Sequence, residues 1–368
     1  MPIPSAARIT LFSSSDAGLI ALAQGEQYVW AQTSLEASGF HRRHDGTYLL
    51  PPESSKTAVV NLVRTAARHQ VTVATSSRRF LGHIADELAA RLPGAWSATL
   101  SVHSHPLWQE DFLPWLWDSG ELMKAVQQAQ VPYAATLRNG AGIELLLIER
   151  PGHRTQYVVG ALTTGDFDGN FREPDAPISL VATEPDLAAG ITERFLPAYR
   201  QALHTRRSAA VATVLDRIRA EYDAWKAKAL VASACYSDAS PLAIDALGVR
   251  TKVFLDRAWD DFLTVLQHGP ALLAPDAPGA ALPENAAVLA RLAGALADAE
   301  AVQEELAADA PLTRQEFNAR MWPAVETWLA DGDTLLSPNP FPVSRRQSAL
   351  PSSGPARGLP PGRPAHRR

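Results

Sequence analysis

The sequence predicts an α+β protein in which two α+β segments with antiparallel sheet precede an all-α helical domain and a disordered basic tail. Three observations lead to this prediction. Short β-rich runs alternate with amphipathic helical runs up to residue 207, and only helical runs follow between residues 208 and 336. Residues 337–368 contain eight prolines and six arginines but no acidic residue, a composition that cannot form a core.

The length and composition indicate a globular protein of several domains. The chain has 368 residues, 46% hydrophobic and 20% charged, and at roughly 150 residues per domain it holds two or three domains. We place the domains at residues 1–95, 96–207 and 208–336, followed by the tail. No apolar run approaches the roughly 18 residues of a membrane span, so we expect no membrane partner. One cysteine and the lack of a secretory signal predict a cytoplasmic protein.

The clearest local signal in the first segment is the pair Asp45-Gly46, which favours a tight hairpin turn between residues 40–44 and 47–50. Before it, Gly39 suits the left-handed position that ends a helix. The other elements expected here are strands at 8–12, 18–23 and 71–74, and helices at 26–38, 56–69 and 79–92.

In the second segment, three strands at hairpin spacing predict an antiparallel sheet with one face on a helix. These strands are expected at residues 133–138, 143–149 and 157–162. Pro197 predicts a kink or break in the helix that closes the segment. The remaining elements are strands at 96–103 and 178–182 and helices at 113–130 and 187–205.

The third segment contains helical patterns only, and Thr313 with Glu316 fits a capping box that opens the last helix. A weak likeness to a helix-turn-helix lies around Gly248. Residues 211–336 hold 10 basic and 19 acidic residues, a net charge of −9 that opposes DNA binding. The helices are expected at 209–232, 251–267, 285–308 and 313–330.

Two histidines, His103 and His105, precede the acidic Glu110 and Asp111. Histidines one residue apart on a strand point to the same face and could bind a metal with a nearby carboxylate. We therefore keep a metal-assisted hydrolase using His103, His105 and Asp111 as an alternative hypothesis, although edge histidines without a ligand explain the pattern more simply. No phosphate-binding loop, dinucleotide fingerprint or nucleophile elbow occurs, so we expect no cofactor.

Four arginines are candidate phosphate contacts: Arg42 and Arg43 in the hairpin, and Arg78 and Arg79 before a helix. If the hairpin lies near Arg78, their guanidinium groups would form a patch for a phosphate backbone. However, segment 1–95 has nine basic and seven acidic residues, and strand alternation sends Arg42 and Arg43 to opposite faces. A charged edge strand explains them equally well.

Tryptophans provide the leading candidate for a partner surface. Trp108, Trp115 and Trp117 cluster, and because Trp115 and Trp117 lie two residues apart, a helix cannot bury both on one narrow face. We expect one of them to line a groove or an interface, although core packing is the simpler explanation. The resulting hypothesis is a non-enzymatic protein that binds a macromolecular partner. That partner is a protein, or a nucleic acid that contacts the arginine-rich tail.

The run LLIERPGH at residues 146–153 resembles uncharacterised proteins encoded by high-GC actinobacterial genomes. The use of 29 arginines against five lysines agrees with the codon usage of such genomes. This resemblance implies no activity, ligand or residue role.

Overall fold

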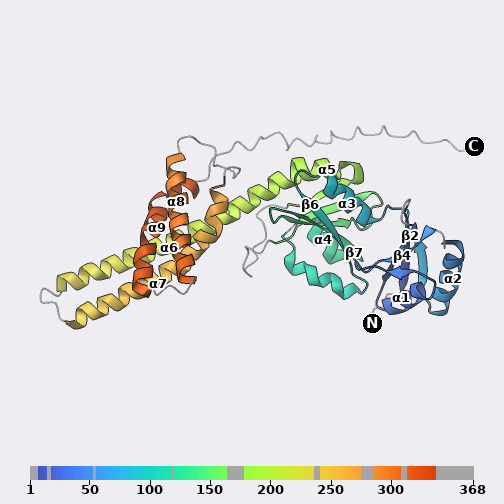
Figure 1. Ribbon diagram of the computed structural model, residues 1–368, viewed down its shortest axis with the longest axis horizontal. Coiled ribbons are helices and arrows are strands. Elements are labelled where there is room, and N and C mark those ends of the chain that lie inside the picture. The colour runs from blue at the N-terminus through green and yellow to red at the C-terminus, as the bar shows by residue number, and fades with distance from the viewer. Residues whose placement is uncertain are drawn as a thin grey trace, which may run out of the picture.

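The protein folds into two β-sheets followed by a region of long helices, as Figure 1 shows. A computed structural model describes residues 7–14, 18–52, 55–117, 120–163, 178–235, 241–274, 286–307 and 313–336. The predicted α+β class with a helical domain is confirmed. The predicted disordered tail, residues 337–368, lies outside the described residues.

The first sheet has the strand order β3-β4-β2-β1-β5, in which β1 is antiparallel to β2 and parallel to β5. The predicted turn forms: Arg43 donates to the Thr47 carbonyl, and Gly46 adopts a left-handed φ of 81°. Two helices cover one face of the sheet. The elements are β1 (Arg8–Ser14), β2 (Gly18–Gln24), α1 (Tyr28–Glu36), β3 (His41–Arg42), β4 (Tyr48–Leu50), α2 (Ser55–Arg68) and β5 (Thr72–Thr75).

Alternation along β1 and β2 gives the first sheet two apolar faces. Ile9 and Leu11 pack under α1 and α2. Phe12, Ile20 and Leu22 point the other way and belong to a core that they share with the second sheet. The first sheet is therefore covered by its own helices on one side and by the second segment on the other.

The second sheet is an antiparallel meander with the order β10-β9-β8-β7-β6. Helices α3 and α5 cover the face that meets the first sheet, and α4 covers the opposite face. Although α3 precedes the domain boundary that we placed at residue 95, it packs on β6 and β7. The elements are α3 (Leu81–Arg91), β6 (Trp96–Val102), η2 (Pro106–Trp115), α4 (Glu121–Gln128), β7 (Tyr133–Asn139), β8 (Glu144–Glu149), β9 (Gln156–Ala161), β10 (Leu180–Thr183), η3 (Glu184–Asp186) and α5 (Leu187–Gly190).

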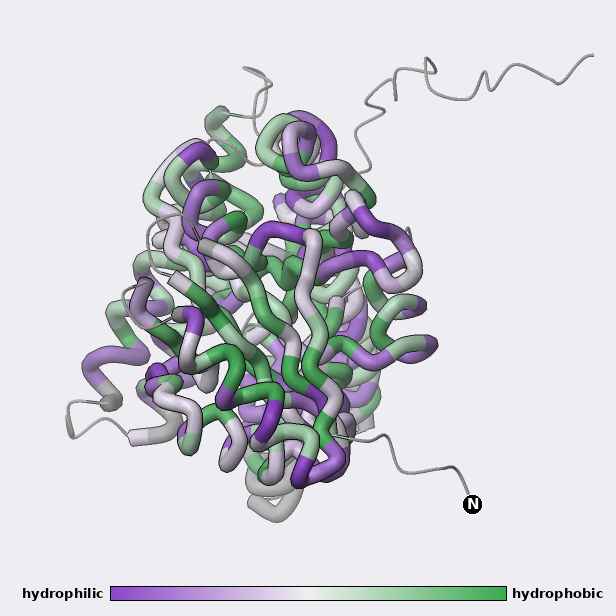
Figure 2. Tube along the Cα trace, turned by 90° about the vertical axis from the view of Figure 1, so that its right-hand side faces the viewer, coloured by the Kyte–Doolittle hydropathy of each residue, from purple (hydrophilic) through white to green (hydrophobic). Residues whose placement is uncertain are grey.

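Hydropathy follows this layering, since Figure 2 shows hydrophobic residues concentrated along the central strands and hydrophilic residues on outer turns and helices.

The helix predicted at residues 113–130 is wrong in its first half. That stretch begins with the end of the 3₁₀ helix η2, which contains Pro114, and α4 begins only at Glu121. Pro114 has no backbone N–H to donate to the hydrogen-bond ladder of an α-helix, which disfavours a regular α-helix in this stretch.

The helical region consists of α6 (Leu196–Cys235), α7 (Pro241–Leu272), α8 (Ala286–Ala307) and α9 (Arg314–Leu336). Helix α6 leaves the second sheet and runs alongside α7, and α8 and α9 cross this pair (Figure 1). Phe262, Phe317 and Trp328 are buried at the crossing. The capping box at Thr313 and Glu316 is confirmed, because the Glu316 carboxylate accepts from the Thr313 backbone N–H.

The break predicted near Pro197 is present: η4, a π-helical turn at Ile191–Phe195, interrupts the α-helical bonding between α5 and α6, and α6 begins at Leu196 and continues through residue 208. A π turn adds one residue per turn, so the chain widens where the missing proline N–H would interrupt regular bonding. Helix α7 begins at Pro241 and includes Gly248, which leaves no turn for a helix-turn-helix.

A largely buried ionic cluster joins the loop after β5 to the end of β8. Arg78 Nη1 lies 3.0 Å from Glu149 Oε2, and the hydroxyl of Tyr133 donates to Glu149 Oε1 at 2.6 Å. Arg78 Nη2 donates to the carbonyl oxygen of His153, and the Arg78 side chain is only 16% exposed. Burial raises the pKa of Glu149, while the hydrogen bond from Tyr133 and the charge of Arg78 oppose this rise. The carboxylate therefore depends on its neighbours to stay ionised.

We expect Arg78→Met to destabilise the fold by about 3–5 kcal/mol at pH 8, because it leaves a buried carboxylate without its counter-ion. The loss should be smaller at pH 5. Without Arg78 the pKa of Glu149 rises further. Glu149 then stays protonated in the folded variant at pH values where the unfolded chain has lost that proton. The stability of the variant therefore falls as the pH rises. Urea unfolding at both pH values measures this difference.

Arg79→Met is the matched control for this prediction. Arg79 contacts Glu87 and Glu184 at the surface, and exposed ion pairs contribute only about 0–1 kcal/mol. Equal losses for the two variants, or a loss at Arg78 that does not change with pH, would contradict the role given to the cluster.

Candidate partner-binding surface

Three aromatic side chains from distant parts of the chain meet where the two sheets join. The ring of Tyr28 lies edge-on to Trp108, with centroids 5.2 Å apart, and 6.3 Å from the ring of His105. The rings of His105 and Trp108 are 6.4 Å apart. We call Tyr28, His105, Trp108 and the neighbouring Leu107 the aromatic surface.

Backbone contacts hold the two halves of this surface together. Gly25, between β2 and α1, donates its N–H to the Ser104 carbonyl at 2.9 Å. Gly25 has a φ of 106°, a left-handed conformation that favours glycine. On the other half, His105 Nδ1 accepts the N–H of Leu107 at 3.3 Å and caps η2. Tyr28 and Trp108 are thus presented by the first turns of two adjacent helices.

The aromatic surface is open to solvent and bordered by acidic side chains. Leu107 is 60% exposed and Trp108 is 41% exposed. In a 3₁₀ helix, residues three apart lie on the same side, so Asp111 follows Trp108 and Glu110 follows Leu107 on their respective sides of η2. Both carboxylic residues are exposed. This combination of exposed rings and nearby carboxylates suits a partner that offers apolar groups and positive charge.

The other two predicted tryptophans lie elsewhere. Trp117 is 2% exposed and packs edge-on against Tyr199, with centroids 5.6 Å apart, so it belongs to the core. Trp115 is 57% exposed at the far end of η2. The two residues differ in burial, but no single helix contains both, because η2 ends at Trp115, and the three tryptophans do not form one surface.

The structure also places the histidines of the hydrolase hypothesis. His103 Nδ1 lies 3.3 Å from the Val131 carbonyl oxygen, while His105 caps η2. Within the part of the chain that the structure describes, no three His, Cys, Asp or Glu side chains are grouped so that they could hold a metal ion. The geometry of these residues therefore gives the metal-assisted alternative no support.

The four candidate arginines do not form a single patch. Arg42 lies on β3 and Arg78 follows β5, which are the two opposite edges of the five-stranded first sheet. Four strand spacings separate them by about 19 Å. Arg78 pairs with Glu149, Arg79 with Glu87 and Glu184, and Arg43 lies 3.9 Å from Asp45. The strand order therefore contradicts the prediction of a phosphate site built from all four arginines.

Comparison of the chain with protein-family models, curated proteins and solved structures finds no match. In the described ranges, no helix has the length and apolar character needed to cross a membrane. Sequence reasoning identified Trp108 but missed Tyr28, which lies 80 residues earlier and has no motif around it.

His103 leads to a prediction about pH. Burial lowers its pKa, while the Val131 carbonyl and Asp111 oppose the shift. As the pH falls below about 6.5, the unfolded chain takes up a proton that the folded protein does not, so stability is lost. We expect His103→Gln to cost stability at pH 8 and to cost less at pH 5. Denaturant unfolding at both pH values measures this; an equal cost at both would contradict it.

Proposed function

We propose that this protein is a non-enzymatic binding protein that uses the aromatic surface to hold a basic, proline-containing segment of a protein. The pairing of Tyr28 with the exposed Trp108 next to acidic residues is the observation that carries this proposal. Proline-rich segments are pre-organised in the extended polyproline conformation and pack on exposed aromatic rings. Positively charged residues in the same segment would meet Glu110 and Asp111.

The charges around the aromatic surface favour a protein partner over a nucleic acid. Binding a phosphate backbone requires a surplus of basic side chains at the contact. Here Glu110 and Asp111 border the rings, and Glu26 lies two residues before Tyr28. The carboxylates would repel phosphates and attract arginine or lysine. We further propose that the protein is cytoplasmic, in keeping with its single cysteine.

A segment with the required chemistry is present in the chain itself. Residues 337–368 carry six arginines, eight prolines and no acidic residue. This segment therefore serves as the probe, because its prolines and arginines match the rings and the carboxylates of the aromatic surface.

The test measures binding of a fluorescent synthetic peptide of residues 337–368 to a chain that ends at Leu336. We expect binding that weakens as salt rises, and Trp108→Ala should reduce affinity at least tenfold because it removes the central ring. Asp111→Asn should reduce affinity and flatten the salt dependence. Fluorescence anisotropy measures both.

Trp115→Ala is the matched control, since it removes another exposed indole, from the other end of η2. We expect its affinity to equal that of the parent. The proposal fails if the peptide does not bind, if Trp108→Ala binds it as the parent does, or if the two tryptophan variants lose the same affinity. Binding of a single-stranded RNA that competes for Trp108 would also overturn the assignment to a protein partner.

A further inference from the structure

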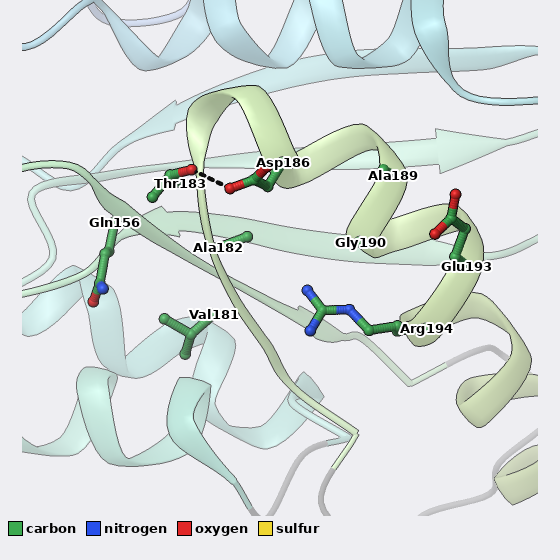
Figure 3. A pocket seen from close by; sticks show the side chains of 9 residues that line it. All are labelled: Gln156, Val181, Ala182, Thr183, Asp186, Ala189, Gly190, Glu193 and Arg194. Atoms are coloured by element: carbon green, nitrogen blue, oxygen red, sulfur yellow. Dashed lines mark hydrogen bonds between the residues drawn. The ribbon is translucent and has the colours of Figure 1, made fainter. Parts of the chain in front are cut away.

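A cleft of about 420 Å³ lies beside β10, at the edge of the second sheet. Figure 3 shows it between β10 on one side and the turn formed by η3, α5 and η4 on the other. Its lining comes from these elements and from the start of β9: Gln156, Val181, Ala182, Thr183, Asp186, Ala189, Gly190, Glu193 and Arg194.

The cleft runs along the edge of β10 rather than above one face of the sheet. Successive strand residues point to opposite faces, and both Val181 and Ala182 line the cleft. On its other side β10 pairs with β9, and among the described strands none pairs with its outer edge. β10 is therefore an edge strand beside the cleft, and its outer backbone N–H and C=O groups have no strand partner among the described residues. Such an edge is a template for an added strand.

Arg194 gives the cleft a positive charge. Figure 3 shows its side chain extending from η4 toward Val181 and Ala182 on β10. No side chain among the described residues forms an ion pair with Arg194. Gly190 lies against this side chain, since a Cβ there would be 3.2 Å from Arg194 Nη2 and 2.9 Å from Leu180 Cδ2.

The two carboxylates of the cleft do not neutralise this guanidinium. Asp186 Oδ2 accepts the hydroxyl of Thr183 at 2.5 Å, which directs it to the η3 turn. Glu193 precedes Arg194 in η4, and its carboxylate points away from the Arg194 guanidinium in Figure 3. The planar guanidinium can thus form two parallel hydrogen bonds with an incoming carboxylate.

We propose that an extended peptide segment of a partner protein adds to the free edge of β10, and that Arg194 binds a carboxylate of that segment. The backbone of β10 supplies hydrogen bonds that do not depend on the peptide sequence. Arg194 then selects a segment that ends in a free C-terminus or carries an Asp or Glu side chain at this point. This site is separate from the aromatic surface and does not rest on the function proposed for it.

The test starts by selecting ligands for the full chain from a library of linear ten-residue peptides with free C-termini. Selected peptides are then synthesised and titrated by calorimetry. We expect Arg194→Gln to weaken binding at least tenfold and Arg194→Lys to retain part of the affinity, because lysine keeps the charge but not the paired geometry. Hydrogen exchange of the backbone at residues 180–183 should slow when the peptide binds.

Arg200→Gln is the matched control, since Arg200 is an exposed arginine on α6 that does not line the cleft. It should leave affinity unchanged, as should Trp108→Ala, so failure here is distinguishable from failure of the aromatic surface. Amidated peptides and peptides with Asn or Gln for Asp or Glu identify the carboxylate. Failure to select any peptide, equal binding by Arg194→Gln, or unchanged exchange at residues 180–183 would overturn the proposal.

Discussion

The structure depends on the packing of two β-sheets against one shared core. Phe12 of the first sheet lies 5.8 Å, ring to ring, from Tyr133 of the second and 5.5 Å from Phe80, which precedes α3. Tyr28 follows the last residues of β2, whereas Trp108 follows β6, so each is carried by a different sheet. The aromatic surface exists only because the shared core holds the two sheets in one arrangement. A shift of one sheet would separate its rings while leaving each sheet intact.

The ionic cluster at Arg78 shows how that arrangement is made specific. Apolar side chains would fill the same space with comparable stability, because burying charges costs hydration free energy that the ion pair only partly returns. Apolar contacts, however, tolerate sliding. Glu149 instead accepts one hydrogen bond from Tyr133 and lies next to Arg78, which also donates to the carbonyl oxygen of His153. These directional contacts set the position of the loop after β5 relative to the end of β8.

Local patterns predicted local structure well, and long-range structure poorly. Asp45-Gly46 predicted its turn because two residues with special backbone preferences are enough to specify one. Pro197 predicted an interruption of its helix but not the form of that interruption, a π turn at Ile191–Phe195 that lies against β10. The aromatic surface shows the same contrast between local and long-range prediction. Exposure of one tryptophan near residue 115 could be inferred from spacing, but the meeting of Tyr28 with Trp108 needs the sheets in place.

The two proposed binding sites also differ in the charge that they select, and this follows from backbone geometry. On η2 the 3₁₀ repeat places Asp111 three residues after Trp108, so rings and carboxylates share one side of a helix. Beside β10 the π turn directs Arg194 toward the strand edge and leaves Glu193 pointing away. Both cases use a helix that departs from 3.6 residues per turn. In a regular α-helix residues three apart would still share a face, but Asp111 would no longer lie directly in line with Trp108, so the spacing between ring and carboxylate would change.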